Sequence, residues 1–161
     1  MNNEKKILVF TATYNEKENI EKLITEIRKN LPIATIFIID DNSPDGTADI
    51  IKNIQQQIQN IDLLVRDKKS GLDSAHKLAY EYSVKNEFEY LITMDADFSH
   101  DPVVLPKFIT ELQSNPFVLG SRYIKGGKCL MKGSRLVMSF IGNKFIKIVS
   151  GINSNEFTTS Y

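Results

Sequence analysis

The stretch YLITMDADFSHDP, residues 90–102, ends an apolar run on two aspartates, Asp95 and Asp97. Residues two apart on a strand point the same way, so both carboxylates can reach one small volume beyond the strand end. Like charges that close repel each other and raise the pKa of one carboxylate, a conflict that a divalent cation removes. Taken alone, such a pair is better explained as a loop start that caps the helix behind Pro102. The rest of the chain has to decide.

Strands and helices alternate on both sides of this stretch. Short apolar or β-branched runs predict strands over 6–11, 35–40, 61–66, 90–95 and 116–120. Apolar residues at helical spacing predict helices over 20–27, 47–58, 72–86 and 103–112, with Thr47 as the N-cap of the second. This alternation predicts an α/β fold with a mostly parallel sheet in three layers.

Acidic residues follow three of the predicted strands. In open α/β sheets, ligands bind outside the carboxyl ends of the strands. The polar residues at those ends are Tyr14, Asn15 and Glu16 after the first strand, Asp40 and Asp41 after the second, Asp95 and Asp97 after the fourth, and Arg122 after the fifth. Loops are polar by chance as well. Three acidic strand ends and a strand-end arginine nevertheless favour a functional site at this edge.

Composition restricts the class of protein. A length of 161 residues suits one domain with a real core, and contents of 42% hydrophobic and 25% charged residues are ordinary for a soluble protein. The lone Cys129 excludes a disulfide framework and fits a reducing compartment. The apolar run near the amino terminus is too short for a signal peptide, and no stretch reaches the ~20 apolar residues of a spanning helix. A cytoplasmic protein is expected.

The charges are distributed unevenly although they sum to zero. From Leu119 onward the chain has seven basic residues and one acid, Glu156, which leaves 13 basic and 19 acidic residues before it. The carboxyl-terminal part is therefore expected to meet something anionic. Nucleic acid is not the expected partner, because the basic stretch contains no known nucleic-acid-binding motif.

Other chemistries fit the motifs less well. The chain has no G-x-G-x-x-G after its first strand and no G-x-x-x-x-G-K-[ST], so dinucleotide and P-loop phosphate sites are unsupported. DDNSPDG resembles a calcium loop only faintly, because Pro44 disrupts the spacing and no glutamate closes it. A phosphatase with Asp95 as nucleophile and Asp97 as acid leaves the other strand-end clusters without a role.

Five segments together resemble family 2 glycosyltransferases, and most closely the polyprenol-phosphate (dolichol-phosphate) mannosyltransferases. They occur in the family's order from about Ile7 to the chain end: ATYNEKENI, IIDDNSPDGTADI, KSGLDSAHKLAY, MDADFSHDP and GSRYIKGG. The resemblance implies the Rossmann-like fold of nucleotide-diphospho-sugar transferases. It also implies one domain over 1–161, in which 1–125 bind the nucleotide-sugar and 126–161 form an acceptor-side part with a basic, apolar helix.

The resemblance also assigns site residues. Ala12 (where the family usually has proline), Tyr14 and Glu16 match positions beside the nucleotide, and Ile39 and Asp41 match positions beside its base and ribose. Asp95, Ala96 and Asp97 match the motif for the diphosphate and its metal, Mg²⁺ or Mn²⁺, with both carboxylates as metal ligands. Arg122, Arg135 and Ser139 match phosphate-binding positions. Asp97, Arg122 and Arg135 are the expected catalytic residues.

The implied function is a metal-dependent, inverting transfer of a hexose to polyprenyl phosphate, with GDP-mannose as the first choice of donor. A family 2 transferase that builds surface polysaccharide from UDP-glucose or a related donor is one alternative. A truncated, non-catalytic relative that binds nucleotide-sugar is another. Peripheral association with the cytoplasmic face of a membrane is expected, and a protein partner is left open. For His100 and His76, structural roles are preferred to catalysis.

The segment Lys132–Gly151 is expected to be a helix with apolar residues on several sides. It is too short to span a bilayer, and it suits either the membrane interface or the protein core. Behind it, NEFTTSY is similar to the family's D-x-T-S-G-F-R with Glu156 in place of the acid. Relatives usually continue beyond the position of Tyr161, so truncation is expected to leave Phe140, Ile146 and Val149 partly uncovered.

Overall fold

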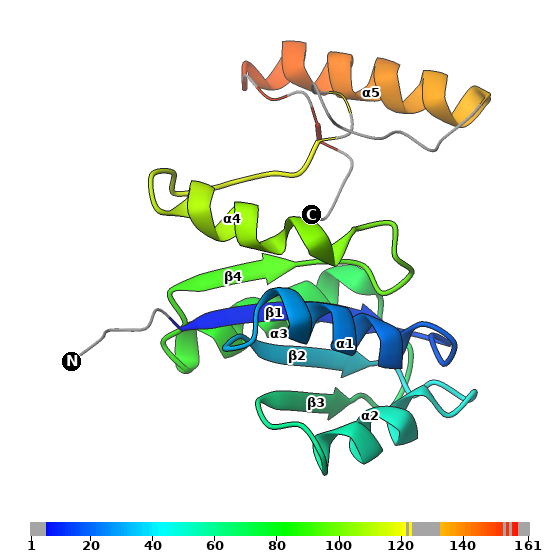
Figure 1. Cartoon of the computed structure of the whole chain (residues 1–161). Helices are drawn as coiled ribbons and strands as arrows, with labels where there is room; N and C mark the ends of the chain where they lie inside the picture. The colour runs from blue at the N-terminus through cyan, green and yellow to red at the C-terminus, as the bar shows by residue number, and fades with distance from the viewer. Residues whose placement is uncertain (1–5, 122, 124–132, 153, 155, 158–161) are drawn as a thin grey trace. The chain divides into compact units, whose positions relative to one another are not determined.

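The computed structural model describes residues 6–121, 123, 133–152 (without the side chain of Arg135), 154 and 156–157. The chain forms two compact units, Met1–Pro116 and Phe117–Tyr161. The first unit contains four strands and most of the helices, and the second contains one long helix (Figure 1). The expected division of labour between 1–125 and 126–161 stays a prediction.

In the first unit, strands and helices alternate along the chain. The elements are β1 (Ile7–Thr13), α1 (Ile20–Asn30), β2 (Thr35–Asp40), α2 (Thr47–Gln55), β3 (Ile61–Val65), α3 (Leu72–Lys85), β4 (Tyr90–Thr93), the 3-10 turn η1 (Pro102–Val104) and α4 (Leu105–Leu112). All strand pairs are parallel, in the order β3-β2-β1-β4. The predicted alternating α/β architecture is thereby confirmed.

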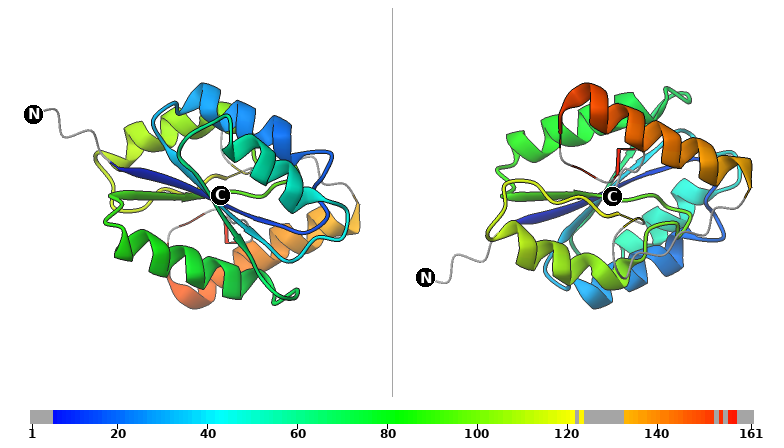
Figure 2. Two further views of the ribbon diagram at one scale, coloured as in Figure 1. Left: turned by 90° about the horizontal axis from the view of Figure 1, so that it is seen from below. Right: turned by 90° about the horizontal axis from the view of Figure 1, so that it is seen from above.

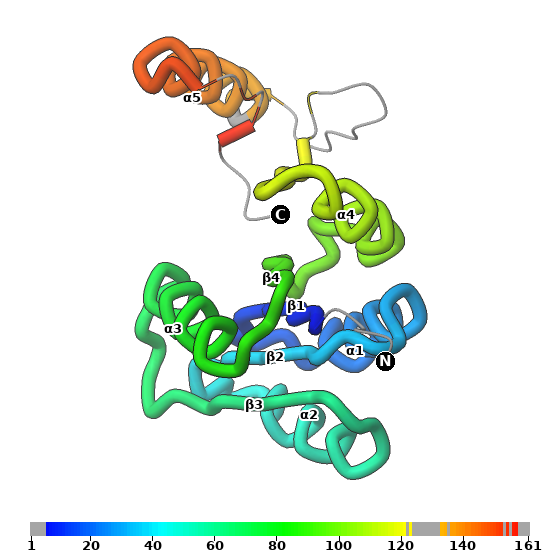
Figure 3. The backbone as a smooth tube through the Cα atoms, turned by 90° about the vertical axis from the view of Figure 1, so that its left-hand side faces the viewer, coloured from blue at the N-terminus to red at the C-terminus, as the bar shows by residue number. Residues whose placement is uncertain are grey.

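The order of the strands explains why helices cover both faces of the sheet. From β1 to β3 the chain moves outward in one direction, and α3 then carries it back past β2 and β1 to β4. Because parallel crossovers are right-handed, a reversal of direction puts the connecting helix on the opposite face. Helices α1, α2 and α4 lie on one face and α3 on the other (Figures 2 and 3). The sheet thus has the expected three layers.

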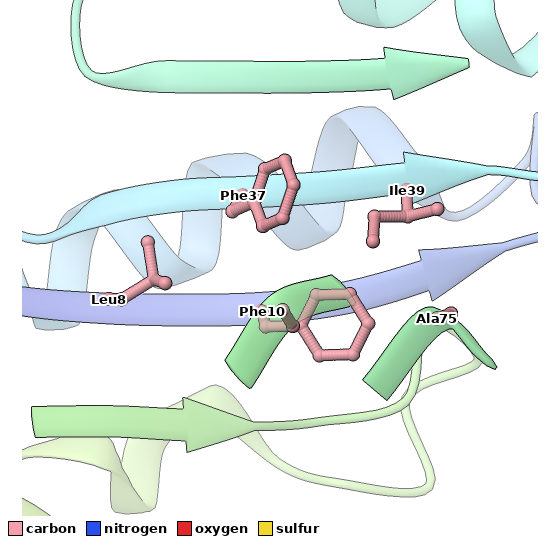
Figure 4. Packing of buried hydrophobic residues seen from close by; sticks show 6 residues of the cluster. Leu8, Phe10, Phe37, Ile39 and Ala75 are labelled. Atoms are coloured by element: carbon pink, nitrogen blue, oxygen red, sulfur yellow. The ribbon is translucent and has the colours of Figure 1, made fainter. Parts of the chain in front are cut away.

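The core under α3 is built by alternate residues of the central strands. Leu8 and Phe10 of β1 and Phe37 and Ile39 of β2 are at most 4% exposed and point toward this helix (Figure 4). The helix meets them with two buried alanines, Ala75 and Ala79. Residues four apart lie on one face of a helix, so these small side chains let it approach the sheet closely. Each large apolar side chain buried here contributes about 1.5–3 kcal/mol.

Two local predictions were wrong. Residues 116–120 form no strand: the chain leaves the first unit there, and Phe117 is 75% exposed. A short apolar segment forms a strand only where a neighbouring strand pairs with its backbone hydrogen-bonding groups. The N-cap of α2 is Gly46, at φ +91°, and not Thr47, which is already helical. The Asp45 carboxylate accepts hydrogen bonds from both the N–H and the hydroxyl of Thr47, at 3.0 and 2.6 Å.

Helix α5 (Ser134–Ser150) dominates the second unit. Its apolar side chains are largely exposed, among them Phe140 at 57%, Ile146 at 37% and Val149 at 69%, as expected. Behind it Glu156 is fully buried, and its carboxylate accepts a hydrogen bond from Asn143 Nδ2 at 3.2 Å. Asn143 Oδ1 accepts one from the Phe157 N–H at 2.6 Å. No helix among the described residues is long and apolar enough to cross a bilayer.

Candidate functional site

The carboxyl ends of β1, β2 and β4 meet at one edge of the sheet. Thr13, the last residue of β1, pairs with Asp40, the last residue of β2. The ladder continues one step further, because Asp41 N donates to Thr13 O at 3.0 Å and Met94 N donates to Phe10 O at 3.0 Å. The direction of winding reverses between β1 and β4, which is where open α/β sheets bind ligands. The residues that follow these strands are therefore gathered at one edge of the sheet, the candidate binding edge, and their binding of a ligand stays a prediction.

Asp40 and Asp41, adjacent in sequence, have different roles. Asp40 is fully buried, and its carboxylate accepts hydrogen bonds from Thr13 Oγ1 at 2.8 Å, Ser43 N at 2.8 Å and Ser43 Oγ at 2.6 Å. The Ser43 hydroxyl in turn accepts one from the Asn15 N–H at 2.9 Å. A carboxylate bonded this completely supports the loops around it. Asp40 is a structural residue of this edge.

The loop after β1 is attached to the start of α2. The Glu16 N–H donates to Thr47 Oγ1 at 3.0 Å, and the Lys17 N–H donates to Asp45 Oδ2 at 3.1 Å. The Glu16 carboxylate accepts a hydrogen bond from Asn19 Nδ2 at 2.8 Å. The main chain beside Tyr14 is therefore held in place, while the Tyr14 side chain stays 38% exposed. A fixed backbone with a partly exposed aromatic ring suits a ligand that packs there.

Asp41 is held by an ion pair with Arg66. Arg66 Nε and Nη2 both contact Asp41 Oδ1, and the Ser70 N–H donates to Asp41 Oδ2 at 3.2 Å. The two side chains are only about 10% exposed. The structure thus places Asp41 at the binding edge as a fixed hydrogen-bond acceptor.

The turn after β4 exposes both carboxylates of the Asp-x-Asp pair to solvent, with His100 Nε2 lying 3.7 Å from Asp95 Oδ2. The Asp95 side chain is 40% exposed and Asp97 is exposed, whereas Ala96 between them is buried. Ser99 contacts both acids: its N–H donates to Asp97 Oδ1 at 2.9 Å and its hydroxyl to Asp95 Oδ2 at 3.5 Å. The cap of η1 is Asp101, whose carboxylate accepts from Val103 N at 3.0 Å. Helix capping therefore does not explain the pair.

The surroundings of Asp97 favour its charged form. Burial alone would raise the pKa of Asp97, but the hydrogen bonds from the N–H and hydroxyl of Ser99 and the nearby His100 outweigh it, so the pKa lies below its usual value. His100 is buried and shapes this turn, since its Nδ1 accepts a hydrogen bond from the Asp95 N–H at 2.9 Å. This contact agrees with the structural role expected for His100.

His76 packs against the core instead of forming hydrogen bonds. Its ring meets Phe10 edge-on at 5.2 Å, and its buried Nδ1 has no hydrogen-bond partner among the described residues. Burial lowers the pKa of His76 despite the opposing charges of Asp95 and Asp73. A neutral, packed imidazole agrees with the structural role preferred for this residue.

The Asp-x-Asp pair fits a hard divalent cation only if a ligand completes the site. No group of three or more His, Cys, Asp or Glu side chains able to hold a metal occurs in the described part of the chain. Asp95 and Asp97 supply two accessible carboxylates, and Mg²⁺ usually takes one or two carboxylates together with substrate phosphates. The donor set therefore fits a metal that binds together with a diphosphate.

The remaining assigned residues lie in different places. Ala12 is half-buried on β1, and Ile39 is fully buried in the core. Ser139, on α5 in the second unit, accepts a hydrogen bond from the Tyr123 hydroxyl at 2.8 Å. Arg122 and the side chain of Arg135 lie outside the described residues.

Two residues at the binding edge were missed by sequence reasoning, Arg66 and Lys69. Arg66 is the last letter of the predicted strand IDLLVR, so its strand-end position was visible. Its partner Asp41 was not. Lys69 Nζ lies 4.0 Å from the centroid of the Tyr14 ring, a contact across 55 residues that no local pattern indicates.

Comparison with known proteins gives the family. The sequence profile of Glycosyl transferase family 2 matches residues 8–158, and the chain belongs to this family. It is 31% identical over 157 residues to an undecaprenyl-phosphate mannosyltransferase of Micrococcus luteus, covering 97% of this chain and 65% of the relative. Against a polyprenol monophosphomannose synthase of Mycolicibacterium smegmatis, identity is 29% over 157 residues, covering 96% of this chain and 59% of the relative. The chain thus spans about 60% of the length of these relatives.

A solved structure with the same fold is a mannosyltransferase from Pyrobaculum calidifontis in complex with GDP-Man and Mn²⁺. The TM-score is 0.59 at 19% sequence identity, over 69% of this chain and 33% of the other. At this identity the likeness concerns the fold alone. It confirms the Rossmann-like nucleotide-diphospho-sugar transferase fold, and the profile and the relatives confirm the resemblance to the polyprenol-phosphate mannosyltransferase branch.

Proposed function

We propose that this chain is the donor-binding part of a metal-dependent, inverting hexosyltransferase that moves mannose from GDP-mannose to a polyprenyl phosphate. One observation carries the proposal: two solvent-exposed carboxylates, Asp95 and Asp97, lie at the β1–β4 binding edge of a chain whose relatives are named as polyprenyl-phosphate mannosyltransferases. The same relatives favour mannosyl transfer to a lipid phosphate over polysaccharide synthesis from UDP-glucose.

The nucleoside of the donor is assigned to the ends of β1 and β2. Tyr14 offers a partly exposed ring there, and Glu16 and Asp41 offer carboxylates. Carboxylates only accept hydrogen bonds, which suits the N–H groups of a guanine base and the hydroxyls of a ribose. In this proposal Ala12 and Ile39 shape the strand ends that carry these groups.

The diphosphate is assigned to the end of β4. Asp95 and Asp97 would hold Mg²⁺ or Mn²⁺ there, and such a cation, when bound, neutralises a diphosphate and makes it a better leaving group. The Ala96 side chain is buried, so within Asp95–Asp97 the two acids are the side chains that reach the surface. The hydrogen bonds from Ser99 and the nearby His100, which lower the pKa of Asp97, act in the direction that favours a charged ligand for the metal.

The transfer itself needs no general base from the protein. A phosphate monoester is already largely a dianion near neutral pH, because its second pKa is about 6. One of its oxygens attacks the anomeric carbon, the bond to the diphosphate oxygen breaks with its electron pair, and the configuration inverts. We assign Arg122, Arg135 and Ser139 to the phosphates, since the planar arginine fork binds phosphate oxygens bidentately.

Contact with the lipid is assigned to α5. This helix carries Lys144 and Lys147, has no acidic residue, and exposes large apolar side chains such as Phe140 and Phe145. Basic residues together with apolar side chains suit the interface of an anionic membrane. We therefore propose peripheral association with the cytoplasmic face of a membrane; a protein partner on the same surface is the alternative.

The proposal is tested by transfer assays in detergent micelles. The protein is incubated with Mn²⁺ and either GDP-mannose, UDP-glucose or UDP-N-acetylglucosamine, with and without polyprenyl phosphate. We expect lipid-linked sugar only from GDP-mannose, only with acceptor, and only when EDTA is absent. Tight GDP-mannose binding without any transfer would identify a nucleotide-sugar-binding protein instead. Transfer from a UDP-sugar alone would assign the other donor class.

A further inference from the structure

The side chain of Arg66, at the carboxyl end of β3, joins three segments of the first unit. Besides its ion pair with Asp41, its Nη1 donates to Ser74 Oγ at 2.6 Å in the first turn of α3. Its Nη2 also donates to Gly71 O at 3.1 Å, directly before that helix. Both partners of the ion pair are about nine-tenths buried. Arginine suits this position because its rigid, planar fork can bond to several acceptors at once.

The loop 67–71 is held at the binding edge by these contacts. The Ser70 N–H bonds to Asp41 at 3.2 Å, and Asn42 Nδ2 donates to Asp67 O at 3.3 Å, so both ends of the loop are tied to the end of β2. Between them, Lys69 places its ammonium group 4.0 Å from the centroid of the Tyr14 ring. A cation over an aromatic face is attracted to the ring. The loop thus connects the ends of β1, β2 and β3.

We propose that Arg66 is a positioning residue for the nucleoside of the donor. It fixes the Asp41 carboxylate, and through Gly71 and Ser74 it fixes the loop that carries Lys69 onto Tyr14. A carboxylate has about four acceptor positions, and Arg66 and Ser70 use those of Oδ1 and one of Oδ2. Among the described residues no other group bonds to Oδ2, and we assign its second position to a base N–H or a ribose hydroxyl. This inference rests on the proposed function, which assigns Tyr14 and Asp41 to the nucleoside.

A purely structural role for Arg66 has a different consequence. Removal of one partner from a buried ion pair leaves an unpaired charge and lowers stability whatever the function. Such a loss of stability would weaken the binding of every ligand of the unit to the same extent. A positioning role affects only ligands with a nucleoside, because inorganic pyrophosphate with Mn²⁺ needs the Asp95–Asp97 turn but not the ends of β1 and β2.

The test compares GDP with pyrophosphate on the full chain, each with Mn²⁺, by titration calorimetry. Arg66→Gln is expected to weaken the binding of GDP about tenfold or more, which is the typical loss when a hydrogen-bond network around a charged group is broken. The affinity for pyrophosphate should stay unchanged. Arg66→Lys keeps the positive charge but lacks the planar guanidinium, so its affinity for GDP should lie between those of the wild type and Arg66→Gln. Arg28→Gln is the matched control: Arg28 Nη1 and Nη2 donate to four carbonyl oxygens at the opposite edge of the sheet, those of Pro32, Ala34, Gln59 and Asn60. It should not change the ratio of the two affinities.

Further variants keep the test decisive if Arg66→Gln does not fold. Lys69 is exposed, so the Lys69→Met variant should fold normally. It should still bind GDP more weakly than the wild type and bind pyrophosphate equally well. The inference would be overturned if a variant lost affinity for GDP and pyrophosphate equally. It would also be overturned if Lys69→Met and Arg66→Lys both bound GDP like the wild type. If the wild-type protein binds neither ligand, the proposed function fails instead.

Discussion

Asp97→Asn is expected to remove most of the metal-dependent binding of GDP-mannose, and Asp95→Asn should do nearly the same. Each substitution keeps the shape of the side chain but takes away a negative charge that a hard cation needs. Substitution of a residue that only hydrogen-bonds to a metal ligand typically lowers metal affinity ~10–100-fold, and the loss of a ligand itself should be larger. Titration calorimetry with and without Mn²⁺ measures it directly.

The control for this experiment is Asp49→Asn. Asp49 lies on the exposed side of α2, where its carboxylate pairs with Lys52 at 2.9 Å, and it receives the same chemical change. It should bind GDP-mannose like the wild type in the presence of Mn²⁺. Wild-type affinity in both the Asp95 and the Asp97 variant would show that the metal and diphosphate are bound elsewhere.

Asp40→Ala is expected to give the largest loss of stability among the strand-end acids. The substitution removes a fully buried acceptor, which receives hydrogen bonds from the buried Thr13 Oγ1 and from the N–H and hydroxyl of the half-buried Ser43. A buried donor left without a partner costs about 1–3 kcal/mol, so the loss of all three bonds should lower the free energy of unfolding by about 3 kcal/mol. For a domain of ordinary stability, ~5–15 kcal/mol, that is a large fraction.

Urea unfolding followed by circular dichroism measures this loss, and Asp49→Ala is the comparison. The Asp49 side chain is 77% exposed, and exposed ion pairs contribute little, so its free energy of unfolding should change by no more than about 0.5 kcal/mol. If Asp40→Ala and Asp49→Ala shift the urea midpoint equally, Asp40 is not the structural centre of this edge.

Much of the fold could be predicted because the periodicity of apolar residues records which faces are buried. TIFIID is rich in β-branched residues and nearly continuously apolar, as is typical of a strand covered on both sides, and it forms β2. The run at 116–120 looked similar in composition but forms no strand. A strand needs a neighbour for its ladder, and local sequence does not say whether one is present.

The candidate site was predicted in outline for the same reason. Parallel strands bring their carboxyl ends to one edge, so Tyr14, Asp41 and Asp95 could be placed together once the strands were assigned. The division of roles between Asp40 and Asp41 could not be predicted, since it depends on partners 25 to 27 residues away, Arg66 and Thr13. Hydrogen-bond partners that distant are decided by tertiary packing and leave no periodic signal.

The location of the donor site is tested most directly by paramagnetic broadening of backbone amide NMR signals. Mn²⁺ is added to ¹⁵N-labelled protein with GDP, and Mg²⁺ with GDP serves as the diamagnetic reference. The amides of 13–16 and 95–100 should broaden first. Those at the other edge of the sheet, such as Ile33, Asn60 and Glu87, should stay sharp, because the seven residues of β1 separate the edges by about 20 Å. Broadening that begins at Ile33, Asn60 or Glu87, or that spares 95–100, would contradict a metal–diphosphate site at the ends of β1 and β4.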